Sequence, residues 1–178
     1  MPRLFTGLKP PPDVTERLAS LRGGLPGARW VETSDYHVTL RFLGDVDDAT
    51  AREFDAMLAE AAPRGALTLR LEGVASFGGD RPRALFAKVA ENRALRELQA
   101  EHERIARAVG LKAETRRYTP HVTLARLRGV SAGDVAATLA GIGAVPALTF
   151  TAEEALLYSA KESVGGGPYR VEASYPLG

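Results

Sequence analysis

The chain has 178 residues, of which 45% are hydrophobic and 25% are charged, with a net charge of +1 and no cysteine. This composition is typical of a globular protein, and the lack of cysteine excludes disulfides, thiolate metal sites and a cysteine nucleophile. Because the net charge is close to zero, binding of nucleic acid would have to depend on a local basic patch.

The sequence also lacks the patterns of membrane insertion and secretion. No run approaches the roughly 18 consecutive apolar residues that a membrane-spanning helix needs. The N-terminal stretch MPRLFTGLKPPPD has neither the apolar segment nor the small-residue cleavage site of a signal peptide. We therefore expect a cytoplasmic protein that does not enter a membrane.

The first half of the chain alternates between strand-like and helical patterns. Its first strand ends at three prolines, and Asp13 is the expected N-cap of the helix that follows. The expected elements are a strand at 3–9, a helix at 13–25, a strand at 37–43, a helix at 47–63, a strand at 66–74 and a loop at 76–83.

The second half repeats the order of strand, helix, strand, helix and strand, and then closes with a hairpin. Asn92 is the expected N-cap of its long helix, and Gly110 is the expected stop signal. The expected elements are a strand at 84–90, a helix at 92–110, a strand at 121–127, a helix at 131–143, a strand at 147–162 bent near 153–154, a tight turn at 163–168 and a strand at 169–177.

This repeated order indicates an internal pseudo-repeat. Strands that are adjacent in sequence, together with the final hairpin, favour antiparallel sheets with helices on their outer faces. We therefore predict an α+β fold formed by a single two-lobed domain over residues 1–178. Each of its two pseudo-symmetric lobes would be an antiparallel sheet with helices on the outer face, and an active cleft would lie between the lobes.

Two of the three histidines begin the same tetrapeptide, His-Val-Thr-Leu, and the second copy follows the first by 84 positions. Successive side chains of a strand point to opposite faces, so each motif presents an imidazole and a hydroxyl on one face. The residues expected on these polar faces are His37, Thr39 and Arg41 in the first strand, and His121, Thr123 and Ala125 in the second. The residues expected on the opposite faces are Val38, Leu40 and Phe42, and Val122 and Leu124.

Two imidazoles and two hydroxyls facing one another across a cleft suit attack on a phosphodiester. One imidazole can act as general base and the other as general acid, since their ordinary pKa lies near 6.5. The hydroxyls of Thr39 and Thr123 can donate to the non-bridging phosphate oxygens. This chemistry needs no metal, cofactor or nucleophilic side chain, and we expect neither a metal nor a cofactor.

The paired motifs resemble those of the two-histidine (2H) phosphoesterase superfamily. The stretches RLFTGL, RWVETSDYHVTLRFLGDV, ETRRYTPHVTLARL and the closing LLYSAKES, GGPYRV and YPL resemble RNA 2',3'-cyclic phosphodiesterases, the LigT/ThpR-like family also known as 2'-5' RNA ligases. This resemblance covers nearly the whole chain. It implies hydrolysis of 2',3'-cyclic phosphate ends of RNA or nucleotides to a 2'-phosphomonoester, with His37 as proton donor and His121 as proton acceptor.

Four further residues are candidates for substrate binding. Arg116 and Tyr118 match a basic-x-aromatic-x-Pro-His pattern of the family, and could clamp a phosphate and stack on a base, or else form a rim ion pair and a packing ring. Arg41 shares the face of His37 and can contribute charge. Arg126 matches an arginine of the family, but its parity places it opposite His121 unless a bulge intervenes.

Neighbouring charges predict different pKa values for the two histidines. Asp35 would raise the pKa of His37, as an acid needs, whereas Arg116 and Arg117 would lower the pKa of His121, as a base needs. The roles of Ser159 and Tyr169, which lie in the closing segments that match the family, stay open.

His102 serves as a control for the other two histidines. It falls in an apolar stripe at helical spacing, so we expect it to be a hydrogen-bonded histidine at the seam between a helix and a sheet. The stripe consists of Leu95, Leu98, His102, Ile105 and Val109.

Three alternatives to the hydrolase stay open. The first is reversible 2'-5' RNA ligation through the same phosphorane, and the second is a non-catalytic module that binds RNA ends. The third is a two-histidine metal site, which lacks further ligands near either motif. The expected partners are RNA with a 2',3'-cyclic phosphate terminus or cyclic nucleotides, and we expect a monomer.

Overall fold

The computed structural model of the protein describes residues 3–160 and 167–178, so most of the expected turn at 163–168 lies outside the described residues. Among the residues described, no helix is long and apolar enough to cross a membrane. The elements are β1 (Arg3–Leu8), α1 (Pro12–Ala19), β2 (Ala28–Trp30), η1 (Thr33–Asp35), β3 (Val38–Asp45), α2 (Asp48–Glu60), β4 (Leu67–Phe77), β5 (Ala84–Val89), α3 (Arg93–Ala108), β6 (His121–Leu127), α4 (Ala132–Ile142), β7 (Leu148–Ala152), β8 (Glu154–Ala160) and β9 (Tyr169–Pro176).

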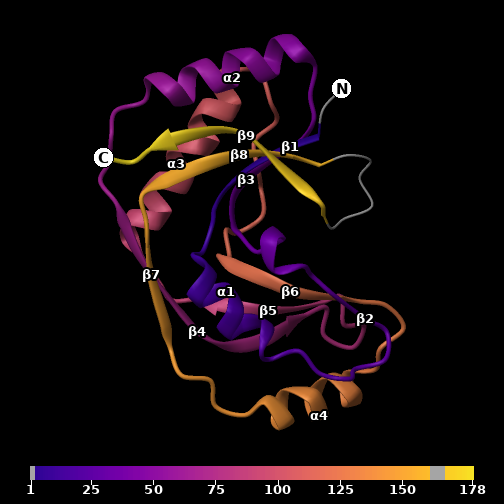
Figure 1. The fold of residues 1–178 in the computed structure, drawn as a ribbon. Helices are drawn as coiled ribbons and strands as arrows, with labels where there is room; N and C mark the ends of the chain where they lie inside the picture. The colour runs from indigo at the N-terminus through magenta and orange to yellow at the C-terminus, as the bar shows by residue number, and fades with distance from the viewer. Residues whose placement is uncertain (1–2, 161–166) are drawn as a thin grey trace.

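The strands form one curled antiparallel sheet in the order β7-β4-β5-β6-β3-β1-β8-β9, with β2 paired to β6 (Figure 1). One half of the sheet carries α2 and α3, and the other carries α1 and α4. The predicted α+β class with two antiparallel halves is confirmed. The halves are nevertheless continuous, because β3 and β6 pair through Val38 and Val122. The two His-x-Thr strands therefore meet at the centre of the sheet.

The two structural halves do not coincide with the two halves of the sequence. The strand β4 from the first half of the chain pairs with β5 and β7, and α3 from the second half packs on β3. The single bent strand expected at 147–162 is wrong. It is two strands, of which β7 pairs with β4 and β8 pairs with β1. They separate at Glu153, whose carbonyl accepts a hydrogen bond of 2.8 Å from the Leu177 N–H.

Local sequence explains where the helices begin and end. Asn92 caps α3 as predicted, because its side chain accepts a hydrogen bond of 2.9 Å from the Leu95 N–H. Gly110 follows the end of α3 with φ of 93°, a conformation that glycine adopts without strain. The predicted N-cap at Asp13 is wrong. The helix α1 starts one residue earlier, at Pro12, where proline fits because its fixed φ is helical and an N–H there would have no partner.

The core lies between the sheet and its helices, and His102 belongs to it. This residue is 2% exposed, and its Nδ1 forms a hydrogen bond of 2.8 Å with the Thr6 hydroxyl. Burial lowers the pKa of His102 to about 4, because a charged imidazole is poorly solvated there. The expected structural histidine at a helix–sheet seam is confirmed.

Candidate active site

The two motif histidines are held in the same way. The Nδ1–H of His37 donates to the Asp35 carbonyl at 2.8 Å, and that of His121 donates to the Thr119 carbonyl at 2.6 Å. Because a carbonyl can only accept, each ring carries its proton on Nδ1 in the neutral form and leaves Nε2 for chemistry. In each case the carbonyl belongs to the residue two positions earlier, so the local geometry of the two motifs is matched.

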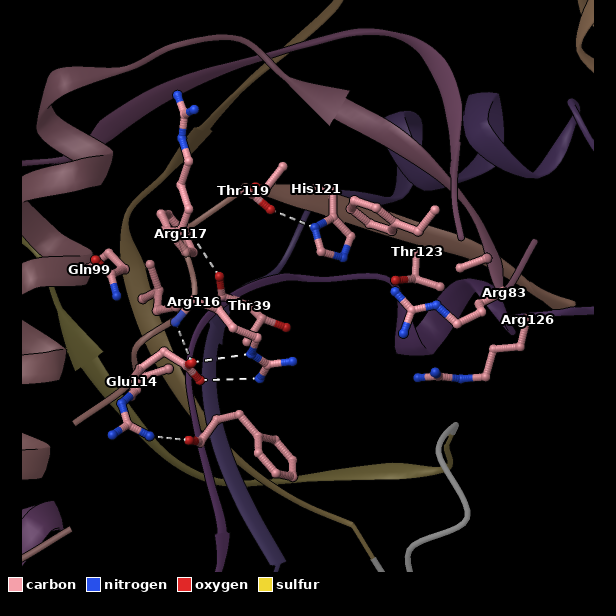
Figure 2. Close-up of a pocket in the computed structure, with 16 residues that line it drawn as sticks. Thr39, Arg83, Gln99, Glu114, Arg116, Arg117, Thr119, His121, Thr123 and Arg126 are labelled. Carbon is pink, nitrogen blue, oxygen red and sulfur yellow. Dashed lines mark hydrogen bonds and ion pairs between the residues drawn. The ribbon is translucent and has the colours of Figure 1, made fainter. Parts of the chain in front are cut away.

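The threonines of the motifs lie beside these imidazoles. The Thr39 hydroxyl is 2.9 Å from the His37 Nε2. Thr39, His121 and Thr123 together line a cavity of about 520 Å³ that is open to solvent (Figure 2). Three of the four motif side chains therefore share one cleft, and His37, which is not among its lining residues, adjoins it through Thr39.

A bulge at the same place in each motif changes the expected alternation. In β3 one extra residue, Leu40, lies between the positions that pair with Gly7 and Thr6. In β6 the extra residue is Leu124, between the positions that pair with Phe86 and Leu85. Both leucines are buried. A bulge of one residue turns every following side chain to the other face.

In the first strand this bulge overturns the predicted positions of two residues. Phe42, expected on the buried face, is 42% exposed and lines the cavity. Arg41 lies next to the cavity but is only 7% exposed. Phe42 is thus a cavity residue that the pattern of alternation missed.

In the second strand the same device moves Arg126 to the side of His121. Arg126 is exposed and lines the cavity, which is the outcome that the sequence allowed only if a bulge intervened. The predicted exposure of Ala125 is wrong, since this residue is fully buried. Phe42 and Arg126 each follow their motif histidine by five positions, and that shared offset is the signal that could have found Phe42.

Burial dominates the protonation of both histidines. It lowers the pKa of His37 to about 4, against the raising effects of the Asp35 carbonyl and carboxylate. The predicted rise in the pKa of His37 is therefore wrong. Burial and the charge of Arg126 also lower the pKa of His121. The lowering of the pKa of His121 agrees with the prediction. Its causes are burial and Arg126, whereas the sequence predicted Arg116 and Arg117.

Aromatic rings account for much of this burial. The ring centroids of Phe5 and Tyr169 lie 4.8 and 5.3 Å from that of His37. On the other side of the cleft, the Phe77 centroid lies 4.9 Å from the His121 ring. These rings displace water from the imidazoles, which disfavours the charged form of each.

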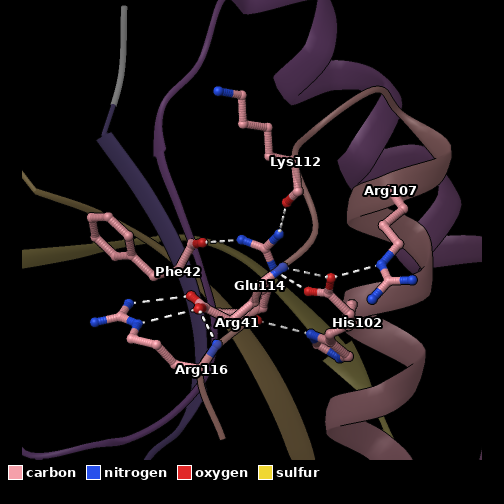
Figure 3. A network of polar contacts seen from close by, with 9 residues as sticks. Arg41, Phe42, His102, Arg107, Lys112, Glu114 and Arg116 are labelled. Carbon is pink, nitrogen blue, oxygen red and sulfur yellow. Dashed lines mark hydrogen bonds and ion pairs between the residues drawn. The ribbon is translucent and has the colours of Figure 1, made fainter. Parts of the chain in front are cut away.

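The guanidinium of Arg41 is occupied within the protein (Figure 3). It forms an ion pair with Glu103 and donates to the carbonyls of Phe42 and Lys112. Glu103 also accepts from the Glu114 N–H at 2.9 Å. The network therefore fastens the loop at 111–120 to β3 and α3, and it leaves Arg41 little capacity to bind a phosphate directly.

The two candidates in this loop also have partners. The Arg116 guanidinium is paired with Glu114, with Nε and Oε1 at 3.1 Å, and this pairing lowers the pKa of Glu114 to about 2. The Tyr118 hydroxyl donates to the Thr39 carbonyl at 2.7 Å. Both residues line the cavity. A ring held by its hydroxyl at this position favours a structural link over free stacking on a base.

Of the two residues with open roles, only Tyr169 is near the histidines. Its N–H donates to the Asp35 carboxylate at 3.1 Å, and its ring packs on His37. Ser159 instead donates to Glu172 at 2.6 Å on the exposed face of β8 and β9. Tyr169 therefore helps to hold the segment that carries the first motif.

Acidic and sulfur ligands do not gather at this site. Within the described residues, no group of three or more His, Cys, Asp or Glu side chains is arranged to hold a metal ion. The cavity is lined instead by arginines. No sequence pattern predicted Arg83 as a site residue, and Arg117 was expected only to lower the pKa of His121. Each of these two arginines is the last basic residue before a strand that borders the site, β5 for Arg83 and β6 for Arg117. This position in the sequence is the feature that could have identified them.

Comparison with known sequences places this site in a family. The sequence profile of the family described as LigT like Phosphoesterase matches residues 8–86 and 88–169. The chain belongs to the LigT-like phosphoesterase family. Each matched segment of this LigT-like phosphoesterase contains one His-x-Thr motif, in agreement with the internal pseudo-repeat.

Individual relatives carry a more specific name. The chain is 38% identical over 104 residues to an RNA 2',3'-cyclic phosphodiesterase of Geobacillus stearothermophilus. This match covers 57% of this chain and 33% of that protein. The chain is also 37% identical over 120 residues to an RNA 2',3'-cyclic phosphodiesterase of Aeropyrum pernix. This match covers 64% of this chain and 67% of that protein. The match thus spans only a third of the first relative.

Solved structures share the whole fold. The structure of E. coli LigT complexed with 3'-AMP has a TM-score of 0.79 and 22% identity, and the match covers 99% of both chains. The structure of E. coli LigT complexed with phosphate has a TM-score of 0.74 and 19% identity, and it covers 98% of this chain and 97% of the other. At this level of identity the likeness establishes the fold of the LigT-like phosphoesterase.

Proposed function

We propose that the protein is an RNA 2',3'-cyclic phosphodiesterase, which hydrolyses the cyclic phosphate end of RNA or of a nucleotide to a 2'-phosphomonoester. The observation that carries this proposal is the matched pair of imidazoles, each fixed through Nδ1, so that Nε2 is the nitrogen that can transfer a proton; in His37 it contacts the Thr39 hydroxyl. The names of the relatives support the choice of substrate.

The proposed reaction is an in-line displacement at phosphorus. A water oxygen forms a bond to phosphorus while the bond from phosphorus to the ribose O3' breaks. The Nε2 of His121 takes the proton of the attacking water, and the Nε2 of His37 gives its proton to O3'. The hydroxyls of Thr39 and Thr123 and the guanidinium of Arg126 donate to the equatorial oxygens, where negative charge gathers.

The assignment of acid and base rests on the family resemblance, because burial lowers the pKa of both histidines in the free protein. The Asp35 carboxylate acts on His37 and favours its protonated form, whereas no carboxylate of the described residues acts on His121 in the same way. Burial makes both rings neutral in the free protein near pH 7. A bound phosphate anion raises the pKa of an adjacent imidazole, so we propose that His37 acquires its proton together with the substrate.

Product analysis tests the proposal. The protein is incubated in a chelator with an oligonucleotide that ends in a 2',3'-cyclic phosphate, and phosphorus NMR compares the product with authentic 2'- and 3'-phosphates. A 2'-phosphate supports the assignment of His37 and His121. A 3'-phosphate would mean that the substrate lies the other way round between them.

The same experiment separates the alternatives. A joined 2'-5' product on adding a second RNA with a 5'-hydroxyl would indicate the ligase, in which that hydroxyl replaces water beside His121. Binding without any product would indicate a module that only binds RNA ends. Loss of turnover caused by the chelator would indicate a metal site.

A further inference from the structure

The arginines that line the cavity fall into two groups. Arg41 and Arg116 are neutralised by Glu103 and Glu114. Arg83, Arg117 and Arg126 also line the cavity, but within the described part of the chain they form no ion pair and no side-chain hydrogen bond. Elsewhere on the surface, some arginines have glutamate partners, as in the pairs Arg64–Glu101, Arg93–Glu97, Arg96–Glu91 and Arg107–Glu103, whereas others such as Arg104 form no ion pair with a described residue.

Two of the unpaired arginines lie together at one end of the cavity. Arg126 in β6 pairs with Ala84, and Arg83 directly precedes Ala84. Figure 2 shows both side chains extending into the cavity next to Thr123. Like charges on neighbouring strands repel each other. An arrangement that keeps two guanidinium groups together without a carboxylate is thus suited to an anionic ligand.

The backbone holds Arg83 firmly in this place. Its N–H donates to the Phe77 carbonyl at 2.8 Å, and its carbonyl accepts from the Leu127 N–H at 2.8 Å. The turn before it depends on Gly78, which has φ of 108° and where a Cβ would come within 2.3 Å of the Arg81 carbonyl. The backbone of Arg83 is therefore held in place before any ligand binds, while its side chain is exposed.

Arg83 and Arg126 differ in their distance from the chemistry. The charge of Arg126 acts on both His37 and His121, whereas no such effect of Arg83 is found. Arg126 is therefore suited to the reacting phosphate and Arg83 to a group farther along the substrate. A cavity of about 520 Å³ also has the size of a pocket for a whole ligand rather than for one phosphate.

We propose that Arg83 binds a second phosphate of the substrate, the one attached to the 5' position of the nucleotide that carries the cyclic end. This inference rests on the proposed function and narrows its substrate to an RNA end or a 5'-phosphorylated nucleotide. Adjacent strands of a sheet lie about 4.8 Å apart. Guanidinium groups carried by two such strands can therefore reach two phosphates of one nucleotide. A nucleoside 2',3'-cyclic phosphate with a free 5'-hydroxyl would leave Arg83 without a partner.

Binding of product analogues tests Arg83 without depending on turnover. Calorimetry measures the Kd of adenosine 2'-phosphate and of adenosine 2',5'-bisphosphate for the wild type, Arg83→Gln and Arg83→Lys. The bisphosphate should bind the wild type more tightly, and Arg83→Gln should reduce that preference by about tenfold, the effect of one charged hydrogen bond. Arg83→Lys keeps the charge and should retain part of the preference.

Two matched variants locate the effect. Arg104→Gln removes a charge from an exposed arginine of α3 that does not line the cavity, and it should keep the full preference. Arg117→Gln removes a charge from the far end of the cavity. Loss of the preference in Arg117→Gln but not in Arg83→Gln would overturn the assignment, because the 5'-phosphate would then lie at the opposite end.

Kinetics on RNA provides the second readout and separates the two proposals. For an oligonucleotide with a cyclic end, the slope of log kcat/KM against log salt should be shallower by about 0.7 in Arg83→Gln, as expected for one lost phosphate contact on a single strand. An equal loss of affinity for both adenosine phosphates would place Arg83 at the reacting phosphate and refute this inference, although hydrolysis would remain. No hydrolysis by the wild type would instead refute the proposed function.

Discussion

The hydroxyl of Tyr118 donates a hydrogen bond of 2.7 Å to the backbone carbonyl of Thr39. Tyr118 precedes the second motif by three positions, and Thr39 belongs to the first motif. Among the described residues, the two motif strands pair directly at one position, Val38 with Val122. The tyrosine therefore provides a second link between the two motifs and fixes how one threonine stands relative to the opposite histidine.

Replacing Tyr118 by Phe should remove this link while keeping the ring. We expect the free energy of unfolding to fall by about 1 kcal/mol, the usual contribution of one hydrogen bond, and kcat to fall by up to about tenfold. Urea unfolding and steady-state kinetics measure the two effects. Tyr169→Phe is the matched control, because its ring packs on His37 and its hydroxyl has no partner among the described residues. A rise in KM with unchanged kcat would show instead that Tyr118 binds the substrate.

Removing either motif histidine should nearly abolish turnover. General acids and bases contribute about 10²–10⁴-fold each, so His37→Ala and His121→Ala should each lose at least about a hundredfold in kcat. Circular dichroism and thermal unfolding check that both variants fold. A variant with nearly normal turnover would remove that histidine from the mechanism.

The threonine variants should lose less than the histidine variants. Thr39→Val and Thr123→Val keep the shape of the side chain and delete one donor to the phosphate, without removing a proton transfer. Because Thr39 also contacts the His37 Nε2 at 2.9 Å, its variant should be the more affected of the two. If either valine variant lost as much kcat as the histidine variants do, the assigned roles would have to be exchanged.

The sequence predicted the chemistry of this site better than its shape. The repeated His-x-Thr unit identified the imidazoles and hydroxyls, because the alternation of a strand holds over three residues. Beyond the threonine, the expected alternation of side chains was wrong for Phe42 and Arg126. The buried residues Leu40 and Leu124 continue the apolar pattern of each strand, so the sequence does not reveal that they are bulges.

Two other features depend on contacts that are distant in the chain. The single strand expected at 147–162 divides at Glu153 because its two parts pair with β4 and β1, and no local pattern records a pairing partner. The lowered pKa of His37 depends on rings from β1 and β9. The residues next to His37 in the sequence predict the effect of Asp35 on its pKa but not the larger effect of burial.

The buried control histidine gives the stability of the protein a pH dependence. The pKa of His102 is about 4 in the folded state and about 6.5 in the unfolded state. Between these pH values the unfolded state binds more protons than the folded state. The contribution of His102 to the free energy of unfolding is therefore fully present above about pH 6.5 and is lost as the pH is lowered toward 4. His102→Asn should reduce the slope of unfolding free energy against pH by up to about 1.4 kcal/mol per pH unit in this window. Urea unfolding at several pH values measures the slope, and an unchanged slope would contradict the low pKa of His102.

The last prediction concerns the pH dependence of catalysis. Turnover needs one imidazole protonated and the other neutral, so kcat/KM should follow a bell whose two limbs belong to the coupled pair in the free protein. The pKa of His37 is lowered to about 4 and that of His121 is also lowered from 6.5. Both limbs should therefore lie on the acid side of 6.5, and kcat/KM should decrease as the pH rises above this value.

The profile of kcat should differ, because it reports the protein with substrate bound. The phosphate anion between the imidazoles raises their pKa, so the optimum of kcat should lie at a higher pH than that of kcat/KM. Arg126 provides the check, since its charge lowers the pKa of both histidines. Arg126→Gln should move the alkaline limb of kcat/KM to higher pH, in addition to lowering the rate. Profiles measured from about pH 4 to 9 decide this, and a kcat/KM that stays constant above pH 7 would mean that the acid in the free protein is a group other than His37 or His121.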